Sequence, residues 1–507
     1  MTEPTLQARA PGFQLLGWLL GLLAVFIGVG VGYLVYLDGV HGQLLQIRLM
    51  GGYPPFVNDL PFVFTGFACV LALALAGLLA WVYLSGEWDR PALGLMVFSL
   101  FADAVPGLFQ FSLLLIGLLI LERWLRRGDL RFPLTPLVFP IAWILLSYTT
   151  TLVLAEKIGN VLPNMGFRMT YIAMVPLFPM IIRTRRHLDI FFHFMILAAV
   201  LSTTTGIAQM ILSYITGQPV TFTTAEYNRI DTPWGPATRC TGLMLHPNHQ
   251  SNALSAVAVL LLFFATKPFG QISREKRILY LSAFVYLGIG VLITWSRSGW
   301  LALGACSMLI PLIRWPKYAL IYLIGLGTIG FIGIESGLAR QVYDAVKDFN
   351  ASSADFRWHI DHIAYQSFMR DPILGRGVGQ MLHFFNPYHL EVHNTYLQAL
   401  SEMGLFGMVG LLGMVGLLAA RMLERLLHTK HFEDRDWVIG LAIAAGITTI
   451  QNLFAMFLWV KFLWAITALM ETAVMVSKRH AHLEEGESEP AAQLFFLRPP
   501  APVTHGH

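Results

Sequence analysis

The chain has 507 residues, of which 56% are hydrophobic and only 13% are charged, and its formal net charge is +4. Soluble domains carry about twice that fraction of charged residues, so the composition indicates a polytopic membrane protein. No basic stripe is interleaved with aromatic residues, which argues against a nucleic-acid partner. The three cysteines are too few for a disulfide framework.

The first two apolar runs, at 13–37 and 60–84, are long enough to cross a hydrocarbon layer that needs roughly 20 apolar residues. The first is too long for a cleaved signal peptide and has no small-residue cleavage site. Further apolar segments follow at 92–105, 107–122, 134–155, 168–182, 188–216, 251–266, 278–295, 298–313, 318–334, 396–420, 437–457 and 459–477. Because several are short or closely paired, we predict an all-α polytopic fold with about 12 to 14 transmembrane helices.

Lysine and arginine cluster in alternate loops, at 122–131, 183–187, 267–277, 314–317, 421–430 and 477–480. The positive-inside rule predicts that these loops are cytoplasmic, and alternation then places both termini in the cytoplasm. The opposite face receives the remaining connections, at 38–59, 156–167, 217–250, 294–298 and 335–395.

The predicted organisation has four parts: helices with short loops (1–334), a loop subdomain (335–395), further helices (396–477) and a disordered cytoplasmic tail (478–507). The loop is too long for a simple connection. It contains an amphipathic helix that Ser352 or Ser353 can cap and that Pro372 ends. The tail is polar and rich in proline.

Several arginines fall on the outer face, where the positive-inside rule should deplete them near helix ends. Arg239 and Arg297 lie close to predicted helix termini there, and Arg168 begins an apolar segment. An arginine at a membrane interface often only snorkels or caps a helix. Guanidinium groups gathered on one face, however, suit a phosphate or diphosphate, which accepts their paired donors.

The segment "EVHNTYLQALSEMGLFG" (391–407) places His393 and Asn394 just before a predicted helix. An imidazole can take a proton from a hydroxyl group near neutral pH. Asn394 can hydrogen-bond a sugar, and it can equally cap the following helix. Glu391 or Glu402 could orient the imidazole, although Glu402 fits helix packing better.

The outer loops contain no D-x-D pair, no H-E-x-x-H motif and no EF-hand spacing. We therefore predict no metal and no cofactor. In a metal-free reaction the arginines would balance the charge that a divalent ion balances in other enzymes.

Four segments, in order and spacing, resemble the superfamily of O-antigen ligases and polymerases. They are "RCTGLMLHPNHQSNALS" (239–255), "TWSRSGWLALG" (294–304), "FRWHIDHIAYQSFMRDPILGRGVGQ" (356–380) and "HNTYLQALSEMGLFG" (393–407). The resemblance covers 239–420, whereas the helices before it are similar only in hydropathy.

The resemblance implies a GT-C-like membrane glycosyltransferase that needs neither a nucleotide sugar nor a metal. The donor would be a glycan on undecaprenyl diphosphate in the inner membrane of a Gram-negative bacterium, with the active site on the periplasmic face. For a ligase of lipopolysaccharide biosynthesis the acceptor is a sugar hydroxyl of lipid A-core. His393 matches the histidine that activates this hydroxyl, and Arg239 and Arg297 match diphosphate-binding arginines. Arg357 and Asn248 occupy motif positions whose roles the resemblance leaves open.

Direct attack by the hydroxyl predicts inversion at the anomeric carbon. A polymerase or a protein O-oligosaccharyltransferase of the same superfamily remains an alternative. We favour the ligase because a single long loop carries the His-Asn motif. A polysaccharide flippase is the non-enzymatic alternative, and its main support would be Asp103 as an acid within the membrane. Membrane lipids are expected partners, and the oligomeric state is left open.

Overall fold

The computed structural model describes residues 89–103, 107–127, 135–154, 165–166, 168–217, 219–221, 228–232, 235–337, 340, 351–379, 392–429, 431–454 and 460–484. The chain forms two compact units, Met1–Leu95 with Thr224–Tyr227 and Met96–Thr223 with Asn228–His507. Of the first unit only 89–95 are described, so the predicted helices at 13–37 and 60–84 lie outside the described residues. All other described residues belong to the second unit.

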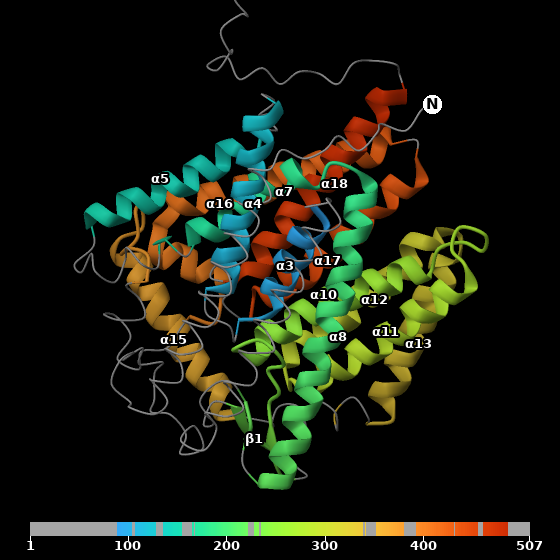
Figure 1. Cartoon of the computed structure of the whole chain (residues 1–507). Coiled ribbons are helices and arrows are strands. Elements are labelled where there is room, and N and C mark those ends of the chain that lie inside the picture. Colours follow the sequence, from blue (N-terminus) through green and yellow to red (C-terminus); the bar gives the residue numbers. More distant parts are fainter. Residues whose placement is uncertain are drawn as a thin grey trace, which may run out of the picture. The chain divides into compact units, whose positions relative to one another are not determined.

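The described elements are almost all helices (Figure 1). In chain order they are α3 (Asp89–Phe101), α4 (Leu108–Arg127), α5 (Val138–Leu154), α7 (Met174–Ile181), α8 (Arg185–Thr216), β1 (Arg229–Thr232), β2 (Gly235–Thr238), α10 (Pro247–Ala265), α11 (Arg274–Ile293), α12 (Arg297–Arg314), η2 (Pro316–Tyr318), α13 (Ala319–Glu335), α15 (Ala351–Arg370), α16 (Thr395–His428), α17 (Phe432–Gln451) and α18 (Lys461–Glu484).

Among the described residues, 4 helices are long and apolar enough to cross a membrane: Arg185–Thr216, Arg274–Ile293, Pro316–Glu335 and Thr395–His428. Four shorter apolar helices accompany them, at Pro91–Phe101, Leu108–Leu121, Val138–Thr150 and Arg168–Ile181. The protein is therefore a mainly helical membrane protein, while the predicted number of crossings is not confirmed. The structure is consistent with the predicted all-α fold, to which β1 and β2 add a short antiparallel hairpin in which Arg229 pairs with Thr238.

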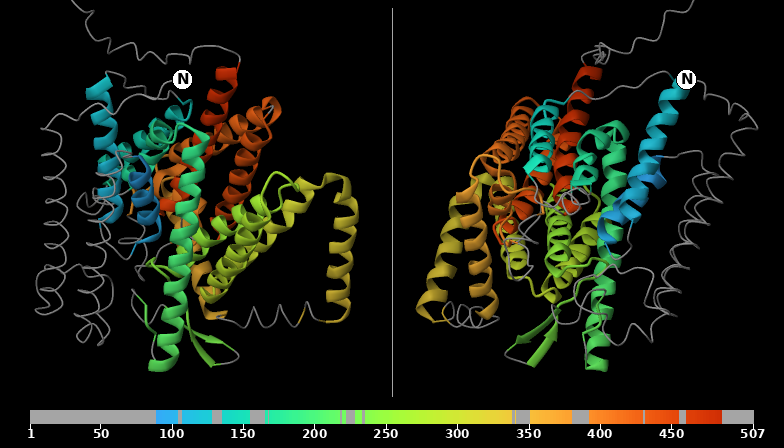
Figure 2. Two further views of the ribbon diagram at one scale, coloured as in Figure 1. Left: turned by 45° about the vertical axis from the view of Figure 1, so that its right-hand side comes forward. Right: turned by 90° about the vertical axis from the view of Figure 1, so that its left-hand side faces the viewer.

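Helix α10 forms the centre of the bundle and contacts α8, α11, α12 and α17. Small side chains make this possible: Ala253, Ser255 and Ala256 are fully buried on α10. Such residues let membrane helices approach closely. On α12, a side chain at Gly299 would collide with Ser251 of α10, so the two helices are in close contact near their N-terminal ends. By contrast, α13 stands apart from α10 and α17 (Figure 2).

Helix α16 is broken at Gly404, whose φ of 62° is in the left-handed region that favours glycine. The segment after α15 enters this break with its backbone: the amide of Leu405 donates to the carbonyl of Pro372 at 2.8 Å, and the amide of Gly377 donates to that of Glu402 at 2.9 Å. A side chain at Gly404 would collide with the backbone of Ile373. The end of α15 is thereby attached to α16.

Two predicted boundaries change. Helix α18 continues to Glu484, so residues 478–484 of the predicted disordered tail are helical, and 485–507 lie outside the described residues. The predicted amphipathic helix exists as α15, and Ser352 and Ser353 lie within its range. Within the predicted loop subdomain 335–395, residues 338–339, 341–350 and 380–391 lie outside the described residues.

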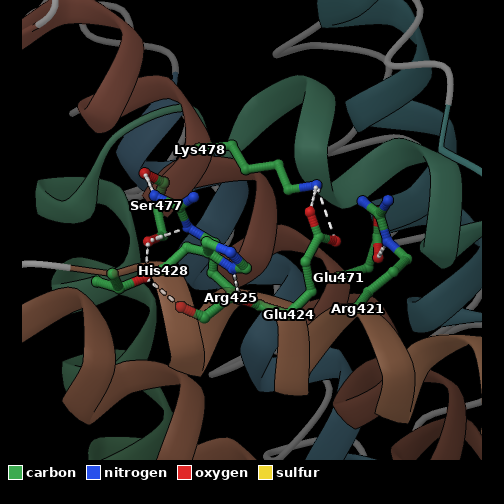
Figure 3. A network of polar contacts seen from close by, with 8 residues as sticks. Arg421, Glu424, Arg425, His428, Glu471, Ser477 and Lys478 are labelled. Atoms are coloured by element: carbon green, nitrogen blue, oxygen red, sulfur yellow. Dashed lines mark hydrogen bonds and ion pairs between the residues drawn. The ribbon is translucent and has the colours of Figure 1, made fainter.

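One end of the unit, which we call the paired end, gathers basic and acidic side chains from many helices. The contacts are Arg185 with Glu433, Arg314 Nη1 with Asp436 Oδ1 at 2.5 Å, Lys267 Nζ with Asp436 Oδ2 at 3.3 Å and His480 Nδ1 with Asp434 Oδ2 at 3.1 Å. Helices α16 and α18 add Arg421 Nη2 with Glu471 Oε1 at 2.6 Å and Lys478 Nζ with Glu424 Oε1 at 3.1 Å (Figure 3). Several loops predicted to be cytoplasmic therefore lie together, although the membrane side they face stays a prediction.

Candidate functional site

A cavity of about 370 Å³ lies away from the paired end, next to the hairpin and α15. It is lined by Ile230, Arg239, Asn248, Trp295, Ser296, Arg297, Ser298, Leu301, Arg357, Trp358, Asp361, His393, Leu453 and Phe454. Five of the seven site residues predicted from the sequence are among them: Arg239, Asn248, Arg297, Arg357 and His393. These five come from four separate motifs, and the fold brings them to one place.

Arg239 is held in the cavity wall by hydrogen bonds from its own side chain. Its Nη2 donates to Asn248 Oδ1 at 2.8 Å, and its Nε donates to the carbonyl of Thr294 at 3.2 Å. The loop that follows Arg239 is fixed by Gln209 of α8, whose Oε1 accepts from the amides of Thr241 and Gly242, each at 3.0 Å. A polar side chain within an apolar helix thus positions an arginine of the site.

The turn between α11 and α12 brings the N-terminal end of α12 to the cavity. Trp295 has a φ of 52°, which is unusual for a bulky residue and marks a constrained turn. Ser296 caps α12 by accepting from the amide of Gly299 at 3.4 Å. Arg297 and Ser298 follow in the first turn of the helix. Because the amides at a helix N-terminus carry partial positive charge, this end of α12 favours an anion.

Helix α15 presents one face to the cavity and the other to the protein. Ile360 and Ala364 are fully buried and pack against Val392, which fixes the rotation of the helix. Arg357 and Asp361, four residues apart, consequently lie together at the cavity. Asp361 Oδ1 accepts a hydrogen bond from the backbone amide of His393 at 3.2 Å, which links α15 to the segment before α16.

The end of α17 is joined to the start of α16 next to His393. The amide of Thr395 donates to the carbonyl of Asn452 at 2.9 Å, and Thr395 Oγ1 donates to Asn452 Oδ1 at 3.2 Å. Leu453 and Phe454, which come directly after Asn452, are 50% and 44% exposed and line the cavity. The wall of the cavity is therefore cationic in one part and apolar in another.

The three arginines raise the positive potential of the cavity. Burial lowers the pKa of Arg239, and the charges of Arg357 and Arg297 lower it further. The pKa of Arg357 is lowered by burial and then by Arg297. Guanidinium groups nevertheless stay protonated at neutral pH. They repel one another, so an anion bound among them would be stabilised.

The same surroundings act on the imidazole of His393. Burial, followed by the charges of Arg357 and Arg239, lowers the pKa of His393 from 6.5 to about 3. The imidazole is therefore neutral at neutral pH and has a nitrogen that can accept a proton. A bound anion would offset the arginines and raise the pKa of His393, which would make it a stronger base.

Two predicted site residues lie elsewhere, and Asn394 is the first. Asn394 caps α16, because its Oδ1 accepts from the amides of Tyr396 and Leu397 at 3.0 and 3.1 Å. The capping alternative is thus the one observed, and Asn394 is not among the residues that line the cavity.

Arg168, the second, is fully buried, and its Nη2 lies 2.6 Å from Glu402 Oε2. The same carboxylate accepts from the amide of Gly379 at 3.1 Å. Glu402 therefore serves helix and loop packing and does not orient His393. The expectation that Arg168 lies at the substrate site is corrected, because Glu402 balances its charge inside the bundle. Glu391 lies outside the described residues.

Sequence reasoning missed Trp358 and Asp361, which follow Arg357 on the same helix, and the apolar pair Leu453 and Phe454. A signal for Asp361 exists in its spacing of four residues from Arg357. Leu453 and Phe454 belong to an apolar run and have no such signal. Within the part of the chain that the structure describes, no group of three or more histidine, cysteine, aspartate or glutamate residues is placed to hold a metal ion.

Comparison with known proteins matches one part of the chain. Residues 282–412 match the family model described as O-antigen ligase, and a search of curated proteins gives no match. The matched segment includes Arg297, Arg357 and His393, whereas Arg239 and Asn248 precede it. Over this part the chain is similar to the O-antigen ligase family, whose members are glycosyltransferase-like membrane enzymes. The match is consistent with the resemblance to the superfamily of O-antigen ligases and polymerases.

Proposed function

We propose that this protein is an O-antigen ligase that transfers a glycan from undecaprenyl diphosphate to a sugar hydroxyl of lipid A-core. One observation carries the proposal: His393 and the three arginines Arg239, Arg297 and Arg357 line a single cavity although they come from separate segments. The family match adds the class of reaction. The lipid substrates and the specificity for lipid A-core belong to the proposal.

The reaction needs a base for the acceptor and cations for the leaving group. The acceptor oxygen attacks the anomeric carbon of the donor, and the bond from that carbon to the diphosphate oxygen breaks. His393 takes the hydroxyl proton, and the electron pair of the broken bond leaves with undecaprenyl diphosphate. The arginines stabilise the negative charge that develops on the diphosphate. Attack opposite the leaving group inverts the anomeric configuration.

Because the cavity is cationic, binding of the donor has a second effect, on the basicity of His393. Without an anion, burial and then the charges of Arg357 and Arg239 hold the pKa of His393 low and keep it a weak base. The diphosphate offsets these charges, so its arrival strengthens the base for the acceptor. We assign no role in this step to Arg168, whose partner is Glu402.

The membrane setting is expected from the chemistry of the substrates. Both lipids keep their tails in the bilayer while their headgroups meet at the cavity, which we place on the periplasmic face of the Gram-negative inner membrane. No metal or cofactor enters the proposed reaction. The partners are the donor glycolipid, lipid A-core and the surrounding membrane lipids.

The two enzymatic alternatives would use the same cavity, whereas a flippase would not use it for catalysis. A polymerase would offer His393 a hydroxyl of another polyprenyl-linked glycan, and a protein O-oligosaccharyltransferase would offer a serine or threonine. The sequence feature that would support a flippase is Asp103, as an acid within the membrane. Lys461 Nζ lies 2.6 Å from Asp103 Oδ1, so the charge of this acid is balanced by a lysine, which weakens the case for transport.

The experiment is transfer in vitro by purified protein with a polyprenyl-diphosphate glycan and lipid A-core. His393→Ala should lower the rate by about 10²- to 10⁴-fold, the range for loss of a general base, while donor binding remains. His362→Ala, an exposed histidine of α15, is the matched control and should keep the wild-type rate. Normal turnover of His393→Ala would remove His393 as the base. Longer polyprenyl-linked chains, or glycan on protein with none on lipid A-core, would contradict the ligase.

A further inference from the structure

We propose that Trp358 and Asp361 of α15 form the subsite that binds the acceptor sugar next to His393. The inference rests on the proposed function and deepens it, because it names the part of the cavity that receives the neutral substrate. Both residues line the cavity, and they are three positions apart on one helix. At that spacing their side chains are neighbours on the helix surface.

Asp361 is the only carboxylate among the described residues that line the cavity. An ionised carboxylate repels a diphosphate, so its presence beside three arginines does not serve the donor. It accepts hydrogen bonds only, and it has room for about four. The amide of His393 occupies Oδ1 at 3.2 Å, which leaves acceptor capacity for sugar hydroxyls.

The position of Asp361 also matches the requirement of the reaction. The acceptor hydroxyl must reach the imidazole of His393, and Asp361 is bonded to the backbone of that residue. A hydroxyl neighbouring the attacking one on the same sugar can therefore donate to Asp361. Burial raises the pKa of Asp361, which shows that its carboxylate is partly shielded from water. Hydrogen bonds from a sugar would replace water around it.

Trp358 supplies the complementary chemistry. Its side chain is 76% exposed although it is large and apolar, and it lines the cavity. The indole ring offers a broad, rigid surface for a ligand with an apolar face. A sugar ring has such a face, formed by its C–H groups, while its hydroxyls point outward at the edge. An aromatic face beside a carboxylate therefore fits a neutral sugar, not a lipid chain or a phosphate.

The test is a kinetic comparison on the full-length protein with separate variation of donor and acceptor. Trp358→Ala should raise the KM for lipid A-core about tenfold, and Trp358→Phe should recover most of this loss. Asp361→Asn should also raise the acceptor KM. The KM for the polyprenyl-diphosphate glycan should not rise in any of these variants. Tyr365→Ala is the matched control, because Tyr365 is a 48% exposed aromatic residue of the same helix that does not line the cavity.

The outcomes separate the two proposals. An unchanged acceptor KM in Trp358→Ala, or a rise in the donor KM in its place, would overturn the subsite while the ligase assignment stands. A wild-type protein that transfers nothing to lipid A-core at any concentration would overturn the ligase assignment and the subsite with it. Because Trp358 is exposed, its replacement should leave folding intact, and a melting curve in detergent verifies this.

Discussion

The cavity and the paired end use the same kinds of charged side chain in opposite ways. At the paired end, Glu433, Asp434 and Asp436 at the start of α17 each contact a basic residue from another part of the chain. At the cavity, three arginines and one carboxylate are among the described lining residues. Burial, and then the charges of neighbouring arginines, lower the pKa of both Arg239 and Arg357 there.

The charged residues of the paired end stabilise the fold, whereas we propose that the arginines of the cavity bind the donor. A buried cation with an acidic partner is neutral as a pair, and its loss destabilises the protein. Cations that repel one another in a cavity reduce stability on their own and are stabilised when an anion binds. This is why we assign the cationic wall of the cavity to the donor diphosphate, and the paired end to the scaffold.

The largest expected effect on folding comes from the paired end. Arg314 is 7% exposed and contacts Asp436, which is 2% exposed, so Arg314→Gln leaves a buried carboxylate with a weaker partner. Because Lys267 still contacts Asp436 at 3.3 Å, we expect a loss of about 1.5–3 kcal/mol in unfolding free energy, with normal donor affinity in the folded fraction. Denaturation in detergent measures the loss, and Arg274→Gln, at an exposed arginine, is the control. Equal stability of both variants would show that the pair does not support the fold.

At the cavity we expect a substitution to weaken donor binding and to leave stability almost unchanged. Arg357→Gln removes a cation that Arg297 repels and Asp361 attracts, so the two effects offset each other and stability should change by less than about 0.5 kcal/mol. Donor binding should weaken by about 1.5–3 kcal/mol, the usual contribution of a hydrogen bond to a charged group. Titration with a polyprenyl-diphosphate glycan in detergent gives the affinity. A variant that binds donor normally but unfolds easily would place Arg357 with the scaffold and break the distinction between the two regions.

The sequence predicts the residues of the cationic wall of the cavity better than those of its apolar wall. Arg239, Arg297 and His393 are polar residues close to apolar segments, and their cost in such a setting makes them conspicuous in the sequence. Arg357 and Asn248 are identified by the resemblance to family motifs. Leu453 and Phe454 have no such contrast with their neighbours. Their place at the cavity depends on the contact of Thr395 with Asn452, which joins two segments far apart in the chain.

Asp361 is another residue whose place depends on the fold. It stands four residues after Arg357, and the buried face of the helix, marked by Ile360 and Ala364, fixes the rotation of α15. That rotation brings Asp361 to the cavity beside His393. Gly404 was equally hidden, because glycine is frequent in membrane helices and only the inserted segment after α15 explains the break.

A smaller effect is expected in the dependence on pH. His393 must be neutral to accept a proton, so the rate falls as the pH drops through its pKa, which is about 3 in the free protein. Arg239, Arg357, His246 and Asp361 are the titratable groups described around it. Arg357→Gln removes a cation that lowers this pKa, so the acidic limb of kcat/KM should move to higher pH by about one unit. A limb that moves to lower pH, or stays fixed, would show that the arginines do not control the base.

The smallest expected effect is that of removing metal ions. Three arginines lining the cavity supply positive charge where a leaving diphosphate would otherwise need a divalent ion, and they are part of the fold whether or not an ion is present. We therefore expect EDTA to leave the transfer rate unchanged within error in the wild type.

The sharper comparison uses Arg357→Gln, in which the cationic wall is weakened. If added Mg²⁺ or Mn²⁺ raises the rate of this variant but not of the wild type, an ion can substitute for the missing guanidinium, as the charge argument requires. If the wild type itself loses activity in EDTA and one specific ion restores it, the arginines do not balance the charge of the diphosphate alone. A metal ion would then have to bind at the cavity, and the arginines would no longer explain the difference between the cavity and the paired end.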